Sequence, residues 1–313
     1  TANFFGVKEQ TEILSILKKR KPDLVHFTNF NFPVAYRGKF VITIHDLTLL
    51  HFRNLRNSLA RKAYYMLKEQ VMRSLVLKQG MRKAQTIIVP SEYVKEDVAK
   101  TFGVRRNKIK VTYEAADTDF SRGRINLAKK GINKPFVLYI GNAYPHKNLE
   151  RMIIAFGKLI TDYVLDYQLV IAGKKDSFHE GLEEAVKEAG LQDRVIFTGF
   201  VTDQELAGLY NNSSLYVFPS LSEGFGLPPL EAMAHKLPVA SSNATCMPEI
   251  LGDAAVYFDP KNIDEMSKAM IDVLTDPKLA ESLIKKGEKQ IRKYSWKKTA
   301  KQTLEIYNSA LGK

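Results

Sequence analysis

The sequence predicts an α/β protein with two doubly wound units, each built around a parallel sheet. Strand-like and helix-like segments alternate along both parts of the chain, which is the pattern of parallel sheets covered by helices. A polar stretch at 115–134 has little apolar pattern and separates the two parts. The chain has 313 residues with 45% apolar content, which is enough for two packed cores.

The first predicted domain covers residues 1–118 and is followed by a linker at 119–134. In chain order we expect a helix near 9–19, strands near 24–27 and 40–44, a basic helix within 53–83, a strand near 86–89 and a helix from Glu92. Ser91 precedes the last of these helices, and its hydroxyl suits an N-cap.

The second predicted domain covers residues 135–293. We expect strands near 136–140, 168–172, 195–197, 215–218 and 238–240, helices from Asn148, Glu180 and Pro228, a helix at 203–211, and helical structure from Asp264 that ends with 296–311. Gly141, Gly173, Gly199 and the loop at Glu223 each follow a strand, so they fall on one rim of the sheet. Parallel sheets bind their ligands at this rim.

Positive charge is concentrated in the first part of the chain. Residues 1–134 contain 27 Lys and Arg against 11 Asp and Glu, and the segment 53–83 has a single acid, Glu69. Apolar residues recur there at helical spacing: Leu59, Ala63, Met66, Leu67, Val71 and Leu75. A basic amphipathic helix predicts contact with an anionic membrane surface, with a merely solvated face as the alternative. No nucleic-acid partner is expected, because the sequence lacks zinc-finger spacing, an RNA-recognition aromatic motif and a basic zipper.

Other features of the sequence indicate the cellular compartment of the protein. No apolar run of about 18 residues is present, so no membrane span is predicted, and the first residues do not resemble a secretory signal. The single cysteine, Cys246, excludes an internal disulfide and fits a reducing compartment. We therefore expect a cytoplasmic protein, peripheral at the inner face of the membrane. Because the chain begins at Thr1, we expect a processed protein or a fragment.

A glycine-rich loop with two carboxylates, Glu223 and Glu231, joins a strand to a helix. Gly224 and Gly226 leave the backbone open to a ligand's oxygens, and a helix N-terminus attracts anions. With Glu231 expected in the first helical turn, its carboxylate suits the vicinal hydroxyls of a ribose, and Glu223 suits those of a hexose. The alternative is that Glu231 only complements the helix dipole while the glycines turn the chain.

A second loop of this kind follows the strand near 136–140. It begins at Gly141 and reaches a helix start at Asn148, with Lys147 placed to meet an anion. A lysine near a helix start is more often a solvated surface residue. The place of Lys147 on the same rim as Glu223 favours the interpretation that this lysine binds a ligand.

These loops resemble those of a known enzyme family. The segment from Glu223 to Glu231 is similar to the Glu-x7-Glu motif of retaining nucleotide-sugar glycosyltransferases of family 4, also called glycosyl transferases group 1. Further similar segments lie at 43–47, 88–92, 139–148, 197–201, 238–242, 247–250 and 294–300, so the resemblance spans nearly the whole chain.

The resemblance implies a GT-B fold, in which two Rossmann-like domains face each other across a cleft. Residues 1–118 would be the acceptor-side domain, residues 135–293 would bind the nucleotide sugar, and the helix at 294–313 would cross back to the first domain. Glycosyltransferase activity, with a nucleotide sugar and a glycan or lipid-linked acceptor as partners, follows from the same resemblance.

The resemblance also implies roles for single residues. Glu231 would bind the ribose, Glu223 the hydroxyls of the transferred sugar, and Lys147 the diphosphate. His45 would face the donor sugar across the cleft, so that His45, Lys147 and Glu223 form the expected catalytic set. The remaining donor-binding residues would be Gly141 and Asn142 in the first loop, Phe200 and Val201 beside the base, and the backbone of Gly224, Phe225, Gly226 and Leu227.

The chain departs from the family pattern at two places. Many members carry an arginine where this chain has Asn142, so Arg151 or Lys174 is expected to contribute positive charge. The chain also starts after the family's first strand, glycine turn and helix. We therefore expect a first domain truncated at its N-terminus, without the acceptor-side glycine loop.

The expected chemistry uses no cofactor and no metal. Lys147 and the helix N-termini would balance the charge that grows on the leaving diphosphate, and this phosphate would take the acceptor's proton with retention of configuration. Asp117 and Asp119 match the Asp-x-Asp metal pattern of another glycosyltransferase fold, but they lie in the polar stretch, so we interpret the match as chance.

Several interpretations of the donor and the activity remain open. The His-Asp-Leu and Pro-His-Lys-Asn segments resemble bacterial mannosyltransferases and favour GDP-mannose, with UDP-glucose or another UDP-sugar as the alternative. A noncatalytic nucleotide-sugar-binding or scaffold protein would bind the donor without turnover. A GT-B epimerase or phosphorylase would need a base or a pyridoxal lysine that the sequence does not identify.

Overall fold

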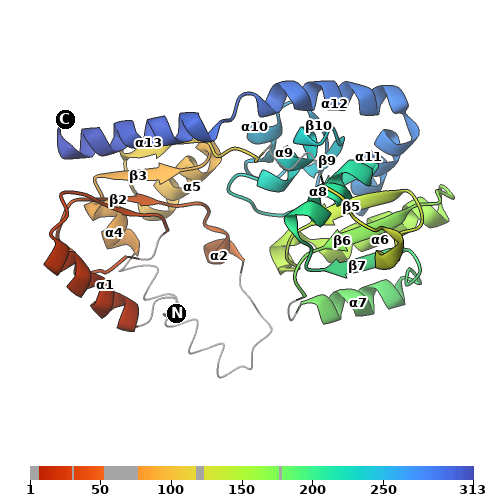
Figure 1. The fold of residues 1–313 in the computed structure, drawn as a ribbon, viewed down its shortest axis with the longest axis horizontal. Helices are drawn as coiled ribbons and strands as arrows, with labels where there is room; N and C mark the ends of the chain where they lie inside the picture. The colour runs from red at the N-terminus through yellow and green to blue at the C-terminus, as the bar shows by residue number, and fades with distance from the viewer. Residues whose placement is uncertain (1–6, 30–31, 53–76, 118–122, 176–177) are drawn as a thin grey trace. The chain divides into compact units, whose positions relative to one another are not determined.

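The computed structural model describes residues 7–29, 32–52, 77–117, 123–175 and 178–313 (Figure 1). It divides into two compact units, which we call the first unit (Thr1–Glu114 with Trp296–Lys313) and the second unit (Ala115–Ser295). Each unit contains a parallel sheet, so the predicted α/β class with two Rossmann-like units is confirmed. Most of the basic helix expected within 53–83 lies outside the described residues.

In the first unit, four parallel strands lie in the order β1 (Val25–Phe27), β2 (Phe40–Thr43), β3 (Thr86–Val89) and β4 (Ile109–Val111). The helices described here are α1 (Val7–Arg20), α2 (Thr48–His51), α4 (Lys78–Lys83), α5 (Glu92–Phe102) and α13 (Trp296–Leu311), with a 3-10 turn η2 (Arg106–Lys108). Phe27, Phe32, Tyr36 and Phe40 form an aromatic cluster in the core. Strand β4 was not predicted.

Helix α5 begins where the sequence indicated. The Ser91 hydroxyl accepts a hydrogen bond of 3.2 Å from the Val94 amide, which satisfies one of the free donors of the first turn. Gly103 follows the helix with φ of 64°, a conformation that ends a helix at low cost for glycine.

In the second unit, six parallel strands lie in the order β10-β9-β8-β5-β6-β7. Their bounds are β5 (Phe136–Ile140), β6 (Gln168–Ala172), β7 (Val195–Gly199), β8 (Leu215–Phe218), β9 (Val239–Ser242) and β10 (Ala255–Phe258). The helices are α6 (Leu149–Thr161), α7 (His179–Glu188), α8 (Asp203–Asn212), α9 (Leu227–Ala234), α10 (Met247–Leu251), α11 (Ile263–Thr275) and α12 (Pro277–Ile291), with 3-10 turns η3 (Ala128–Lys130) and η4 (Pro145–Lys147). Strand β10 and helix α10 were not predicted.

The strand order places a switch point between β5 and β8. The chain passes from β5 to β6 and β7 on one side, and then returns to build β8, β9 and β10 on the other. Strands β5 and β8 are paired neighbours, with Val137 opposite Leu215 and Leu138 opposite Tyr216. Loops that leave two such strands turn in opposite directions, which opens a ligand-binding space at the carboxyl edge. These loops are the two that the sequence singled out.

The polar stretch that resembled a linker packs, where it is described, against the second unit. A Cβ on Gly123 would lie 2.3 Å from Cβ of Ala207 in α8, so the backbone contacts this helix directly. The buried Gln168 side chain accepts from the amides of Asn133 and Lys134, at 2.9 and 3.2 Å. The units divide after Glu114 and Ser295, whereas the sequence suggested boundaries near 118 and 293.

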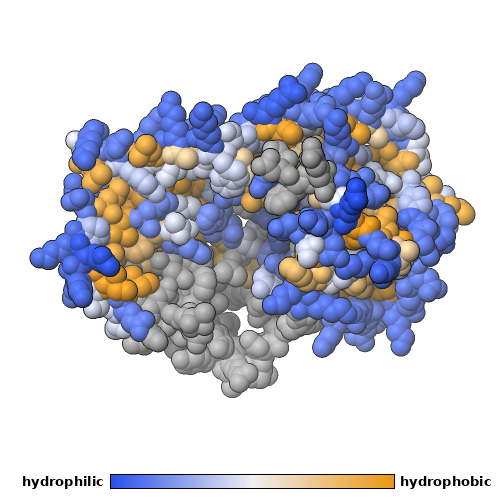
Figure 2. All heavy atoms as spheres, viewed as in Figure 1, coloured by the Kyte–Doolittle hydropathy of each residue, from blue (hydrophilic) through white to orange (hydrophobic). Residues whose placement is uncertain are grey.

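Within the described ranges, no helix is long and apolar enough to cross a membrane. Figure 2 shows hydrophilic side chains along the outer edge of α12. This face of the helix is solvated, as the many lysines and glutamates of its sequence indicate.

Candidate active site

The loops after β5 and β6 approach each other closely because both contain a glycine at the contact. A Cβ on Gly173 would lie 2.0 Å from the carbonyl oxygen of Gly141. A substituent at position 173 would therefore push the loop after β5 out of place.

The loops after β5 and β8 are joined by hydrogen bonds. The Asn148 side chain, 5% exposed, donates to the carbonyl oxygens of Pro219 at 3.0 Å and Pro260 at 2.7 Å. The Leu221 amide donates to the His146 carbonyl at 2.7 Å. Asn148 has φ of 62°, so its backbone turns left-handed immediately before α6. The loops on the two sides of the switch point thus form one assembly.

This assembly brings Lys147 and Glu223 together. The Lys147 ammonium lies 2.7 Å from Oε1 of Glu223, and the two side chains are only 17% and 14% exposed. The ammonium also lies 5.8 Å from the centre of the Phe218 ring. Lys147 is therefore a mostly buried partner of an acid in the glycine-rich loop, unlike a solvated surface lysine.

The backbone of Glu223 is held by the residues that follow β9. Its amide donates to Oγ1 of Thr245 at 3.2 Å, and its carbonyl accepts from Sγ of Cys246 at 3.4 Å. Burial raises the pKa of the Cys246 thiol well above its ordinary value, so the sulfur keeps the proton that it donates. Sequence analysis did not single out Thr245, because its partner is 22 residues earlier in the chain.

Gly226 ends the glycine-rich loop and caps α9. Its φ of 93° favours glycine, and a Cβ there would lie 2.8 Å from the Met247 side chain. Phe225 is 4% exposed and packs edge-to-face on Tyr294, with ring centres 5.5 Å apart. The Phe225 side chain thus anchors the glycine-rich loop to the segment directly after α12.

Glu231 lies deeper in α9 than the sequence indicated. The helix begins at Leu227, one residue before Pro228, so Glu231 is its fifth residue and the first turn contains no acid. The expected first-turn position was wrong, and with it the interpretation that Glu231 only complements the helix dipole loses its basis.

An aromatic side chain, itself held by a second ring, orients the Glu231 carboxylate. Tyr210, which the sequence did not reveal, donates its hydroxyl to Oε2 of Glu231 at 2.9 Å. Burial raises the pKa of Glu231, and the hydrogen bond from Tyr210 opposes this shift. Tyr210 itself is stacked on His235 at 5.0 Å between ring centres.

The other predicted donor residues lie at the same rim of the second unit. Phe200 is 74% exposed after β7, beside the half-buried Val201. Asn142 is exposed and accepts from the Tyr144 amide at 3.4 Å. Of the two residues considered as substitutes for the family arginine, Arg151 donates to Oδ1 of Asn148 at 2.9 Å, and Lys174 is exposed.

His45 belongs to the first unit, directly beyond the end of β2. Its Nδ1 lies 2.9 Å from Oε1 of Glu114, and its Nε2 lies 3.1 Å from the carbonyl oxygen of Thr28. The hydrogen bond with Glu114 raises the pKa of His45. The sequence did not indicate Glu114, which is 69 residues away along the chain.

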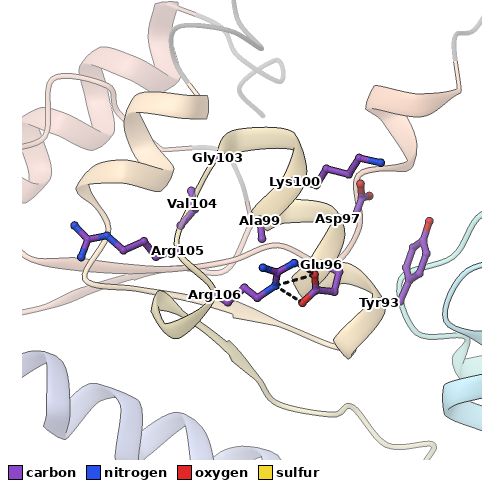
Figure 3. A pocket seen from close by; sticks show the side chains of 9 residues that line it. All are labelled: Tyr93, Glu96, Asp97, Ala99, Lys100, Gly103, Val104, Arg105 and Arg106. Atoms are coloured by element: carbon purple, nitrogen blue, oxygen red, sulfur yellow. Dashed lines mark hydrogen bonds and ion pairs between the residues drawn. The ribbon is translucent and has the colours of Figure 1, made fainter.

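The first unit also contains an open cavity of about 670 Å³ between α5 and the turn into η2. Figure 3 shows Arg106 facing Glu96 there, and the guanidinium donates to both carboxylate oxygens. Asp97, another lining residue, accepts from Nε2 of His51 at 2.9 Å. Both carboxylates of this cavity are thus engaged within the unit.

Comparisons with known proteins agree with the two units. Residues 124–290 match the family model "Glycosyl transferases group 1", and residues 4–120 match "Glycosyltransferase Family 4". The chain is 28% identical over 301 residues to the O-antigen chain mannosyltransferase B of Escherichia coli, covering 93% of this chain and 75% of that protein. It is 34% identical over 240 residues to the serotype-specific mannosyltransferase WbdA of Escherichia coli, covering 73% of this chain but only 29% of that longer protein.

A solved structure shares the fold. The Anabaena protein HepE, crystallised with UDP and glucose, superimposes with a TM-score of 0.74 at 18% identity, covering 97% of this chain and 83% of that one. Both units therefore have the Rossmann-like folds of GT-B glycosyltransferases. The matched family model covers more than half of the chain, and the chain belongs to the glycosyl transferases group 1 family and is a glycosyltransferase.

Proposed function

We propose that this glycosyltransferase moves mannose from GDP-mannose, with retention of configuration, to a glycan or lipid-linked acceptor. The observation that carries the proposal is the buried contact between Lys147 and Glu223 at the switch point of the six-stranded sheet. The relatives named above as mannosyltransferases support mannose as the sugar. The neighbour crystallised with UDP and glucose supports a nucleotide-sugar donor, and it keeps UDP-glucose as the alternative.

Each group near the switch point suits one part of such a donor. The Glu231 carboxylate, oriented by Tyr210, would accept hydrogen bonds from the two ribose hydroxyls. The Lys147 ammonium and the partial positive charge at the N-terminus of α9 would bind the diphosphate. The exposed Phe200 ring would lie against the base, with Val201 at its edge.

Donor binding in this scheme exchanges the partners of an existing ion pair. Lys147 and Glu223 neutralise each other across their 2.7 Å contact. The diphosphate would take over the ammonium, and hydroxyls of the hexose would take over the carboxylate. A nucleoside diphosphate without a sugar could satisfy only the ammonium, which would leave a mostly buried carboxylate without its partner.

The transfer step breaks the bond between the sugar's anomeric carbon and the diphosphate oxygen. Negative charge grows on the leaving diphosphate, where Lys147 and the N-terminus of α9 would stabilise it without a metal ion. The acceptor hydroxyl attacks the same face of the sugar, and its proton passes to the leaving phosphate oxygen. Turnover should therefore persist in the presence of EDTA, and loss of turnover on chelation would contradict this part of the proposal.

A thermal-shift panel tests the donor. GDP, UDP, GDP-mannose and UDP-glucose are compared, because a ligand that binds only the native state raises its melting temperature. We expect the largest shift with GDP-mannose, and no shift with any of the four would contradict the donor site. Mass spectrometry of the released nucleoside diphosphate then separates an enzyme from a noncatalytic binding protein, since the latter would bind the donor without turnover.

We further propose that the enzyme works in the cytoplasm at the inner face of the membrane. The proposal rests on the basic segment 53–83 and on O-antigen synthesis as the named role of the relative. Cosedimentation with anionic vesicles but not with neutral ones is the expected result, and salt should weaken it.

A further inference from the structure

We propose that Glu114 is a positioning residue that holds His45 as an imidazolium, so that His45 serves sugar transfer as a charged hydrogen-bond donor and not as a general base. The proposal rests on the proposed function and on the role that the family resemblance implies for His45, which is to face the donor sugar. It is carried by the two contacts that the ring makes within the first unit.

Both partners of the ring are pure acceptors. Nδ1 contacts a carboxylate oxygen of Glu114 at 2.9 Å, and Nε2 contacts the peptide oxygen of Thr28 at 3.1 Å. Neither oxygen carries a proton to donate when Glu114 is ionised. A neutral imidazole has one N–H, so it would set a nitrogen lone pair against an oxygen lone pair at one of the two contacts. The arrangement is satisfied only when both nitrogens are protonated.

The neighbouring charges favour the same state. The carboxylates of Glu114 and Asp46 both raise the pKa of His45, and partial burial opposes them. Asp46 keeps its own place in the turn, because its Oδ1 accepts from the Thr48 amide at 2.7 Å.

The one other titratable ring beside His45, among the residues that the structure describes, is His26 on β1. Its nitrogens contact the Tyr307 hydroxyl at 2.5 Å and the Thr43 hydroxyl at 2.8 Å, and hydroxyls can donate as well as accept. Burial and the charge of His45 lower the pKa of His26. Of the two histidines, the surroundings therefore favour a positive charge on His45 and oppose one on His26.

A charged ring limits what His45 can do. An imidazolium has no free lone pair, so it cannot accept a proton from an acceptor hydroxyl. Its Nε2–H can instead turn from the Thr28 oxygen to an oxygen of a ligand, and a charged donor makes a stronger hydrogen bond than a neutral one. The acceptor's proton is thereby left to the leaving phosphate.

Glu114 acts through His45 and not on the substrate. Its side chain is 18% exposed, against 52% for His45, and its carboxylate contacts the His45 ring. Because the folded-state pKa of His45 is raised, the stabilisation from this pair is complete below the ordinary value of 6.5 and is lost as the pH rises through the raised value.

The first test observes the ring directly. In a histidine-labelled full chain, two-dimensional NMR follows the two ring nitrogens of His45, which are assigned by their loss in His45→Gln. We expect His45 to titrate above 6.5, and Glu114→Gln, which keeps an acceptor but removes the charge, to lower that midpoint. A midpoint that stays unchanged or rises in Glu114→Gln would overturn the proposal.

The second test follows turnover against pH. If the imidazolium is the active form, kcat falls as the pH rises through the titration of His45, and Glu114→Gln moves this fall to lower pH. Glu114→Asp, which keeps the charge, should restore part of the wild-type profile. A rate that increases through the same titration would show a general base and overturn the proposal.

A matched control separates the effect of Glu114→Gln on the pH profile from the effect of losing any histidine–carboxylate contact. His51 and Asp97, also in the first unit, form such a contact at the same 2.9 Å. Asp97→Asn should leave the pH profile unchanged, and a shift equal to that of Glu114→Gln would contradict a specific role for Glu114. If no donor is turned over at all, the proposed function fails while the NMR titration still decides the protonation state.

Discussion

Two pairs of a cation and a carboxylate lie at the carboxyl ends of parallel strands, one in each unit, and they differ in how they can be opened. Lys147 and Glu223 are 2.7 Å apart and both mostly buried, whereas His45, 2.9 Å from Glu114, is half exposed. In the proposed function, the diphosphate of the donor separates the first pair. In the further proposal, a rise in pH through the titration of His45 removes the positive charge of the second pair. Similar geometry would thus give one pair that responds to a ligand and one that responds to protons.

The largest effect should follow from removing either member of the buried pair. We expect Lys147→Ala and Glu223→Ala each to lower kcat about 10²- to 10³-fold, because each loses an interaction with the donor in the transition state. The melting temperature should also fall, because the remaining charge is mostly buried and loses its partner, but the fold should be kept. Lys158→Ala, which breaks an exposed ion pair with Asp264 in the same unit, is the control and should keep wild-type turnover. Wild-type-like turnover in Glu223→Ala would refute the site assignment.

The next largest effect should be on stability, when the Asn148 side chain that joins the two loops is removed. Asn148→Ala should lower the free energy of unfolding by about 1–3 kcal/mol, since two buried carbonyls lose their donor. Urea denaturation measures it. Asn148→Gly removes the same amide but suits the left-handed backbone, so it should recover only the part of the loss that is due to strain. Full recovery in Asn148→Gly would show that the hydrogen bonds contribute little.

Glu223→Gln should increase an affinity, the affinity for a nucleoside diphosphate. With Lys147 released from its carboxylate, we expect GDP or UDP without a sugar to bind about 5-fold more tightly, which corresponds to about 1 kcal/mol. Isothermal titration calorimetry measures the affinity. Glu183→Gln, which affects an exposed pair with Lys175, should leave it unchanged. Equal or weaker binding in Glu223→Gln would argue against the exchange of partners.

The smallest effect concerns the second glutamate of the loop. Tyr210→Phe removes a hydrogen bond that lowers the pKa of Glu231, so this pKa should rise further. Nucleotide affinity should then fall about 2- to 5-fold in mildly acidic buffer, where more Glu231 is protonated, and recover as the pH increases. Tyr257→Phe, whose hydroxyl contacts Gly252 elsewhere in the unit, is the control. A loss of affinity that is independent of pH would contradict this account.

Local signals in the sequence were enough to predict most strands of the two sheets and the positions of the two glycine-containing loops. The strand at 86–89 and the helix from Glu92 were predicted to the residue, because their apolar runs and the Ser91 cap are short-range features. Strands β4 and β10 were missed, since each has only three or four residues and β4 includes an exposed lysine. The described part of the polar stretch lies in the second unit, where it packs through its backbone and against Gln168, and no apolar pattern in the sequence reveals such contacts.

The candidate site was predictable only where its residues follow each other along the chain. Lys147 and Glu223 were found through their own loops, but their direct contact depends on Asn148, whose partners lie 71 and 112 residues away. Glu114 and Tyr210 contact His45 and Glu231 across 69 and 21 residues of the chain, and no periodic pattern marks them. Glu231 was placed one or two residues too close to the start of α9, because the left-handed Gly226 starts this helix sooner than the prolines suggested.

Because it includes helix α13, the first unit is made of two separate segments of the chain, and this affects how it can fold during synthesis on the ribosome. The helix contacts β2, its Tyr307 bonds His26, and its Thr299 hydroxyl donates to the Tyr113 carbonyl, yet all of the second unit is translated before it. The second unit is one continuous segment and can fold as soon as it leaves the exit tunnel. The first unit has to wait for residues 296–313, so a nascent chain stopped at Ser295 would leave the earlier half unfinished and the later half complete.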